Sequence, residues 1–179
     1  MTLERLLVTN SAPTLANMKC SSLICLKGLN GAVESVVARL EKKGLKFRFL
    51  SSHSGNPLLF VFRQSELMDA IRSKEASTYL ESIGYDTSNL ESCLSLLEKR
   101  LHEEDFPHEI GFFLGYPAED VLQYIKEDGR NYISSGLWKV YTNKEKAEKT
   151  FMKYEKCRKV YMTLFANGFS IDRLCIRTA

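Results

Sequence analysis

Residues 45–50 read Leu45-Lys46-Phe47-Arg48-Phe49-Leu50, and residues 58–62 read Leu58-Leu59-Phe60-Val61-Phe62. Both runs are rich in the aromatic and branched side chains that are favoured in strands. The polar segment between them, Ser51–Pro57, contains Gly55 and Asn56 and is longer than a tight turn. We therefore expect a β-hairpin here, with a loop that connects two paired strands.

Apolar runs and helical periodicity extend this interpretation to both sides of the hairpin. Four further apolar runs predict strands at residues 22–27, 110–114, 137–141 and 171–176. Amphipathic patterns and caps predict helices at residues 2–9, 31–43, 64–83, 88–101, 117–126 and 144–166, with a break near Ser73. The chain has 179 residues, a usual length for one domain. We expect a single domain over residues 1–179 of the α/β or α+β class, in which helices pack on a mixed sheet of five to six strands.

The composition excludes several classes of protein. Hydrophobic residues make up 44% of the chain and charged residues 26%, as in ordinary globular proteins. No apolar run approaches the roughly 20 residues of a membrane helix, and the first residues lack the features of a signal peptide. The chain has five cysteines, an odd number, and no secretory signal, so we expect reduced thiols and a cytoplasmic location. We also expect Cys93, Cys157 and Cys175 to be packed in the core.

The segment 106–117 is the strongest candidate for chemistry. The imidazole of His108 could act as a general base, with Glu109 as the acid or the orienting group. Adjacent residues of a strand point to opposite faces, however, and this argues against their joint action on one atom. The other two histidines, His53 and His102, have no spacing that links them to a nucleophile, and no Gly-x-Ser-x-Gly motif is present.

A ligand site near the end of the 110–114 run is the alternative for the same segment. Sheets of this class tend to bind ligands where strands end, and Tyr116 and His108 lie near that end. The run 136–141 adds Trp138, Lys139 and Tyr141, and the rings of Trp138 and Tyr141 could stack on a planar ligand. Burial of these rings in the core is the simpler interpretation of the same pattern.

Two weaker patterns concern metals and nucleic acids. Cys20 and Cys25 have no second pair to complete a zinc site, so we expect no metal. A stripe of lysines on the helix 144–166 could bind phosphates: Lys146, Lys149, Lys153 and Lys156. Because acidic residues alternate with this stripe and the net charge is only +3, a solvated helix face is favoured over nucleic-acid binding.

Several segments together resemble one bacterial family. The long motif His108–Val121 (HEIGFFLGYPAEDV), the run Gly136–Tyr141 (GLWKVY) and the ending Gly168–Leu174 (GFSIDRL) are similar to blocks of domain-of-unknown-function family 3793. Thr14–Lys19 (TLANMK) resembles its N-terminal block, although Cys20-Ser21-Ser22 stands where the family has Pro-Ala-Asn. The resemblance implies a bacterial protein and suggests a link to redox or iron metabolism, since members occur near flavodoxins and iron-handling proteins. It supplies no activity, fold or catalytic residue.

We therefore expect a cytoplasmic accessory protein that binds a small molecule or a protein partner through His108, Tyr116, Trp138, Lys139 and Tyr141. The first alternative is a small enzyme that uses His108 in acid–base chemistry. The second is a nucleic-acid-binding protein that uses the lysine stripe. The sequence names no substrate and no cofactor.

Overall fold

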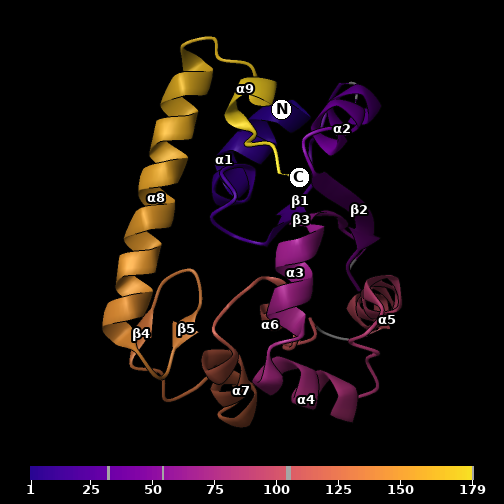
Figure 1. Ribbon diagram of the computed structural model, residues 1–179, viewed down its shortest axis with the longest axis vertical. Coiled ribbons are helices and arrows are strands. Elements are labelled where there is room, and N and C mark those ends of the chain that lie inside the picture. Colours follow the sequence, from indigo (N-terminus) through magenta and orange to yellow (C-terminus); the bar gives the residue numbers. More distant parts are fainter. Residues whose placement is uncertain (32, 54, 104–105, 179) are drawn as a thin grey trace.

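Helices on both faces of a small antiparallel sheet make up the architecture (Figure 1). The computed structural model describes residues 1–31, 33–53, 55–103 and 106–178. The helices within these residues are α1 (Leu3–Leu15), α2 (Val33–Glu41), α3 (Gln64–Ile71), α4 (Lys74–Ser82), α5 (Leu90–Glu103), α6 (Ile110–Phe113), α7 (Ala118–Lys126), α8 (Lys144–Ala166) and α9 (Ile171–Leu174). The strands are β1 (Ser21–Cys25), β2 (Leu45–Ser51), β3 (Pro57–Arg63), β4 (Ser134–Ser135) and β5 (Lys139–Val140).

The main sheet has three strands in the order β1-β3-β2, and both pairings are antiparallel. The β2–β3 hairpin pairs Leu45 with Arg63 and Ser51 with Pro57, so the predicted hairpin is confirmed. The first strand, predicted at residues 22–27, is confirmed as β1. Ala32 and Ser54, which fall in the predicted helix 31–43 and in the hairpin loop, lie outside the described residues.

The central strand β3 is buried on both faces, which explains its continuous apolar sequence. Phe60 and Phe62 pack with α3, α4, α5 and α6 on one side, in the first core cluster. Leu59 and Val61 pack with α1, α2 and α9 on the other side, in the second cluster. Because successive residues of a strand point to opposite faces, this one strand joins two separate cores.

The predicted sheet of five to six strands is wrong. Within the described residues the structure is α+β, with the three-stranded sheet and a separate pair formed by β4 and β5. The segments 110–114 and 171–176, predicted as strands, contain the short helices α6 and α9. The strand predicted at 137–141 is reduced to the two residues of β5.

Burial on all sides explains the error at 110–114. All four residues of α6 are buried, so the run has no polar face, and a short apolar run of this kind does not distinguish a strand from a buried helix. Gly115, at φ +68°, terminates the helix. Its N–H donates to the carbonyl of Phe112, and the N–H of Tyr116 donates to the carbonyl of Gly111. These two bonds form a Schellman motif, for which a glycine after an apolar run is typical.

The error at 171–176 has a different cause. Ile171, Leu174 and Cys175 are the buried residues of this segment, and their spacing is that of one helix face. The apolar run was therefore compatible with a helix from the start. After α9 the chain is extended, and the N–H of Ile176 donates to the carbonyl of Leu15 at 3.0 Å.

Helix α1 is longer than the predicted helix 2–9 because it continues past a kink. Ser11 has non-helical angles (φ −128°, ψ 15°), and Pro13 follows it. A proline is tolerated near the start of a helical segment, so the helix resumes after the kink and ends at Leu15.

The side chain of Arg63 connects the end of α1 to the C-terminal segment. It is fully buried, at 0% exposed. Its guanidinium donates to the carbonyls of Thr14 and Leu15 at 2.9 Å and to that of Ile176 at 2.8 Å. It also reaches the Thr178 hydroxyl at 3.0 Å. These acceptors satisfy a charge that would otherwise be costly to bury.

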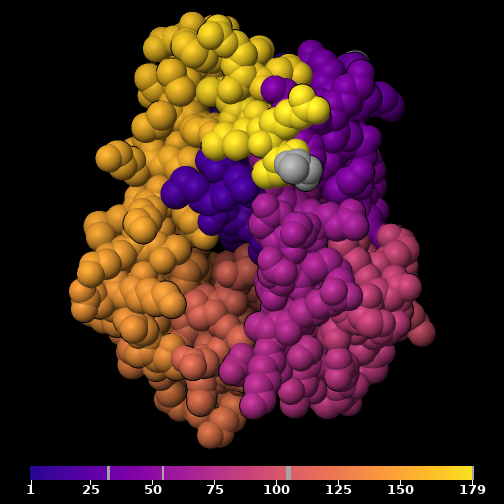
Figure 2. Space-filling model, viewed as in Figure 1, coloured from indigo at the N-terminus to yellow at the C-terminus, as the bar shows by residue number. Residues whose placement is uncertain are grey.

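Helix α8 lies along one flank of the molecule, beside α1, with β4 and β5 near its N-terminal end (Figure 1). In the space-filling view the orange-to-yellow C-terminal part covers this flank, and the indigo N-terminal segment lies between it and the magenta part (Figure 2). The α1–α8 contact includes a bond of 3.0 Å from the Tyr154 hydroxyl to the Met18 carbonyl. No helix in the described part of the chain is long and apolar enough to cross a membrane.

Candidate ligand-binding site

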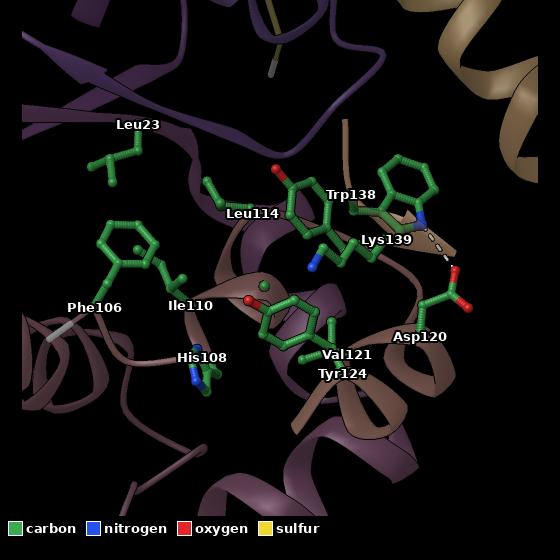
Figure 3. Close-up of a pocket in the computed structure, with 12 residues that line it drawn as sticks. Leu23, Phe106, His108, Ile110, Leu114, Asp120, Val121, Tyr124, Trp138 and Lys139 are labelled. Atoms are coloured by element: carbon green, nitrogen blue, oxygen red, sulfur yellow. Dashed lines mark hydrogen bonds between the residues drawn. The ribbon is translucent and has the colours of Figure 1, made fainter. Parts of the chain in front are cut away.

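A cavity of about 310 Å³ opens between α6, α7 and the β5 region. Its size is at the lower end of the ~300–1,000 Å³ range of small-molecule pockets. Aromatic and aliphatic side chains make up most of its lining, and Figure 3 shows Phe106, Tyr124 and Trp138 on different sides of it. The lining residues are Leu23, Phe106, His108, Ile110, Gly111, Leu114, Tyr116, Asp120, Val121, Tyr124, Trp138 and Lys139.

Close packing of α6 on α7 sets the floor of the cavity. A Cβ atom on Gly111 would lie 2.8 Å from Cγ2 of Val121, so only glycine permits this approach. A Cβ atom on Gly115 would lie 2.6 Å from the Cys20 sulfur. The Schellman turn at Gly115 then directs Tyr116 into the cavity wall.

Asp120, on the first turn of α7, holds the opposite wall. Its carboxylate is 3% exposed. Oδ2 accepts the Trp138 indole N–H at 2.8 Å (Figure 3). Oδ1 accepts the backbone N–H of Tyr141 at 2.9 Å and both the N–H and the hydroxyl of Thr142 at 3.0 Å. One buried carboxylate therefore fixes both the indole and the backbone after β5.

Trp138 is the only tryptophan of the chain and lies among other rings. It stacks on Tyr116 with a centroid distance of 5.2 Å and an interplanar angle of 30°. It also meets Phe151 of α8 edge to face at 4.5 Å. These contacts and the bond to Asp120 hold the indole in one orientation at the cavity wall.

Lys139 supplies the cation of the cavity. Its amine donates to the Gly129 carbonyl at 2.6 Å. It lies 4.8 Å from the ring centroid of Tyr132 and 5.6 Å from that of Tyr124. Lys139 has no carboxylate partner among the residues that the structure describes, so its charge is compensated by rings and a carbonyl alone.

His108 lies exposed at the mouth of the cavity. Its ring meets the Tyr124 ring edge to face at 5.1 Å. Within the described residues its ring nitrogens have no hydrogen-bond partner, so nothing there fixes the tautomer. Phe106 also borders the mouth, and its φ of +36° is unusual for a residue that is not glycine. Strained backbone of this kind is enriched at ligand sites.

Glu109 lies elsewhere. It is 3% exposed and forms an ion pair of 2.5 Å with Arg100 of α5. The Tyr85 hydroxyl donates to the same oxygen at 3.0 Å, and burial together with this carboxylate strongly raises the pKa of Tyr85. The ion pair has a structural position between α5 and α6. The Glu109 carboxylate is therefore engaged with Arg100 and Tyr85 and does not orient the His108 ring.

Four of the five residues proposed as ligand-binding line the cavity: His108, Tyr116, Trp138 and Lys139. Tyr141 does not line it. Trp138 directly precedes the two-residue strand β5, which begins at Lys139. The sequence analysis missed Asp120 and Tyr124, whose i, i+4 spacing on α7 was a usable signal once the helix was assigned.

The remaining candidates stay apart from this cavity. All five cysteines are free, and Cys93, Cys157 and Cys175 are buried as predicted. The His53 Nδ1–H donates to the His102 carbonyl at 3.0 Å. The acidic residues Glu104 and Asp105, which follow His102 closely in the sequence, lie outside the described residues. No group of three or more potential metal ligands occurs in the described ranges.

The lysine stripe lies on the exposed side of α8. Lys149 forms an ion pair of 2.6 Å with Glu145, one turn earlier. Lys159, just beyond the stripe, pairs with Glu155 at 3.6 Å. The acidic residues therefore share this surface with the lysines, as an ordinary solvated helix face would.

The fold and this cavity define an α+β protein with a small, aromatic-lined pocket. A family model described as Protein of unknown function (DUF3793) matches residues 7–175, and the chain belongs to this family. Comparisons with curated proteins and with solved structures give no match.

Proposed function

We propose that this protein binds a small, flat, anionic molecule in the cavity between α6, α7 and β5. The single observation that carries the proposal is the stacked pair of Tyr116 and Trp138 in the same cavity as the Lys139 amine, which has no carboxylate partner among the described residues. Aromatic walls favour a planar ring system. A cation favours a carboxylate or a similar group on that ring system.

The cavity volume limits the ligand to about one or two fused rings. Its lining is mostly apolar, so the anionic group should be placed near Lys139 while the rings occupy the rest. All five cysteines are free thiols, which supports a reducing compartment. Together with the resemblance to a bacterial family, this supports the proposal of a bacterial cytoplasmic location.

Calorimetric titration with 2-naphthoate tests the proposal, with the neutral 2-naphthol as the paired ligand. We expect saturable binding of 2-naphthoate and about tenfold weaker binding to Lys139→Met, because one charged contact is worth ~1.4 kcal/mol or more. The matched control is Lys46→Met on β2, an exposed lysine that does not line the cavity, which should bind as the original protein does. Equal affinities of the two variants, or no preference over 2-naphthol, would contradict the proposal.

A second candidate is catalysis by His108, favoured by its exposed ring at the cavity mouth. The lack of an orienting carboxylate in the described residues makes this the weaker proposal, since general bases are usually held in place by such a group. An activity on any ligand of the cavity should then fall by about 100-fold in His108→Gln. An unchanged rate in that variant would remove His108 from the mechanism.

A further inference from the structure

A second cavity, of about 300 Å³, lies between α1, the start of β1, the β4–β5 turn and α8. Its floor is apolar and includes Pro13, Leu137 and Phe151. Its charged residues are Lys19, Glu155 and Arg158. None of these charged residues takes part in the binding proposed for the first cavity.

The backbone before β1 presents Lys19 to this cavity. After α1 the chain turns at Asn17, whose φ is +54°. The N–H groups of Met18 and Lys19 both donate to the Pro13 carbonyl, at 2.8 Å and 3.2 Å. The Tyr154 hydroxyl donates to the Met18 carbonyl from α8. Lys19 is therefore held by both walls of the cavity.

The three charges of the cavity are not equivalent. Arg158 binds Glu155 through two bonds of 2.8 Å, so this pair is internally neutral. Lys19 is half-buried and, within the described part of the chain, has no ion pair and no side-chain hydrogen bond. Its amine lies 5.2 Å from the Tyr116 ring centroid. The cavity thus has one uncompensated positive charge over an apolar floor.

We propose that this second cavity binds a small carboxylate with an apolar body, and that Lys19 holds the carboxylate. The apolar floor accepts the body, and a charge-assisted bond to the amine replaces the water that a half-buried ammonium lacks. The neutral Glu155–Arg158 pair leaves this attraction unopposed at the wall of α8.

The ionisation of Lys19 supports this assignment. Burial lowers the pKa of its amine to about 8. A bound carboxylate stabilises the charged form, so the affinity should be retained below pH 8 and lost above it. The other titratable groups around Lys19 do not change their protonation state to the same extent between pH 7 and 9. Burial raises the pKa of Tyr116, Tyr154 and Cys20, which favours their neutral forms. The bond to Arg158 lowers the pKa of Glu155, which favours its carboxylate.

Titration with hexanoate, with hexanol as the neutral control, tests the proposal. We expect saturable hexanoate binding that is about tenfold weaker at pH 9 than at pH 7, as the protonated fraction of Lys19 falls. Lys19→Met, which keeps the apolar stem, should lose at least tenfold in affinity. Lys19→Arg should bind without this pH dependence, because the guanidinium stays charged.

Lys46→Met is the matched variant, because Lys46 is an exposed lysine of β2 that lines neither cavity, and it should leave hexanoate binding unchanged. Thermal melting of each variant shows whether it is folded. The proposal is overturned if hexanoate fails to bind at millimolar concentration, if folded Lys19→Met binds as the original protein does, or if Lys46→Met loses the same affinity.

Discussion

Replacing Asp120 by Asn should separate the two tasks of this carboxylate. The amide has nearly the same shape, and its oxygen can still accept the three bonds from Tyr141 and Thr142 that Oδ1 accepts. Its nitrogen, however, would replace the Oδ2 atom that accepts the Trp138 indole N–H at 2.8 Å. Two donors would then face each other, and rotating the amide would place its nitrogen against three donors instead.

The size of the effect follows from these bonds. An unsatisfied buried donor costs about 1–3 kcal/mol, and the three remaining bonds become weaker when the charge is removed. We expect Asp120→Asn to lower the free energy of unfolding by about 2–4 kcal/mol. Asp128→Asn, at an exposed position just after α7, is the control and should change it by less than about 0.5 kcal/mol.

A double-mutant cycle with Trp138→Phe tests the stated cause. Without the indole N–H, the amide nitrogen no longer faces a donor, so Asp120→Asn should cost about 1–2 kcal/mol less in that background. Urea unfolding followed by circular dichroism measures all four proteins, because the phenylalanine variant lacks the tryptophan fluorophore. If Asp120→Asn costs the same with and without the indole, the Asp120–Trp138 bond does not account for the loss.

Three further predictions concern other parts of the molecule. Arg63→Met should destabilise the protein by roughly 3–5 kcal/mol, because several buried carbonyls lose their donor, while exposed Arg5→Met should be near neutral in the same urea unfolding. Gly115→Ala should lower the melting temperature, since the added Cβ would crowd the Cys20 sulfur and φ is +68°, and an unchanged melting temperature would contradict the packing described. Burial lowers the pKa of Lys19 from 10.5 to about 8, so between these two pH values the unfolded chain binds a proton that the folded protein does not. The free energy of unfolding, relative to that of Lys19→Met, should therefore rise with pH over this window. A relative free energy that stays flat or falls would refute this prediction.

The sheet could be predicted from the sequence because its central strand has an unambiguous pattern. The continuous run from Leu58 to Phe62 has both faces buried, and the polar loop before it indicates the hairpin partner. Helix α8 was likewise predicted with its observed bounds, since Asn143 caps its start and Gly168 follows its end. In both cases local sequence and tertiary packing favour the same element.

The short helices could not be assigned from apolar character alone. α6 is buried on every side, so neither a period of 2 nor one of 3.6 is visible in Ile110–Phe113. The glycine at 115 was the better signal, because it ends the helix in the left-handed region. At α9 the spacing of Ile171 and Leu174 indicated a helix, and the apolar residues around them obscured it.

The candidate site was predicted in part, and on a different physical basis. His108 and Tyr116 were selected as residues near a strand end, and Trp138 and Lys139 as residues of a neighbouring strand. The structure places all four along a cavity beside two helices instead. Asp120 was not selected from the sequence. Its position opposite Trp138 depends on the path of the chain between α7 and β5, which no local pattern specifies.

The indole signal of Trp138 in a ¹H–¹⁵N correlation spectrum tests the central claim most directly, because the chain has one tryptophan and therefore one such signal. The indole lines the proposed site and is bonded to Asp120. On titration with 2-naphthoate we expect this signal to shift saturably, with the same dissociation constant as calorimetry gives, and to shift at higher ligand concentration in Lys139→Met. An indole signal that stays in place while 2-naphthoate binds would show that the ligand occupies another site, and the account of this cavity would be wrong.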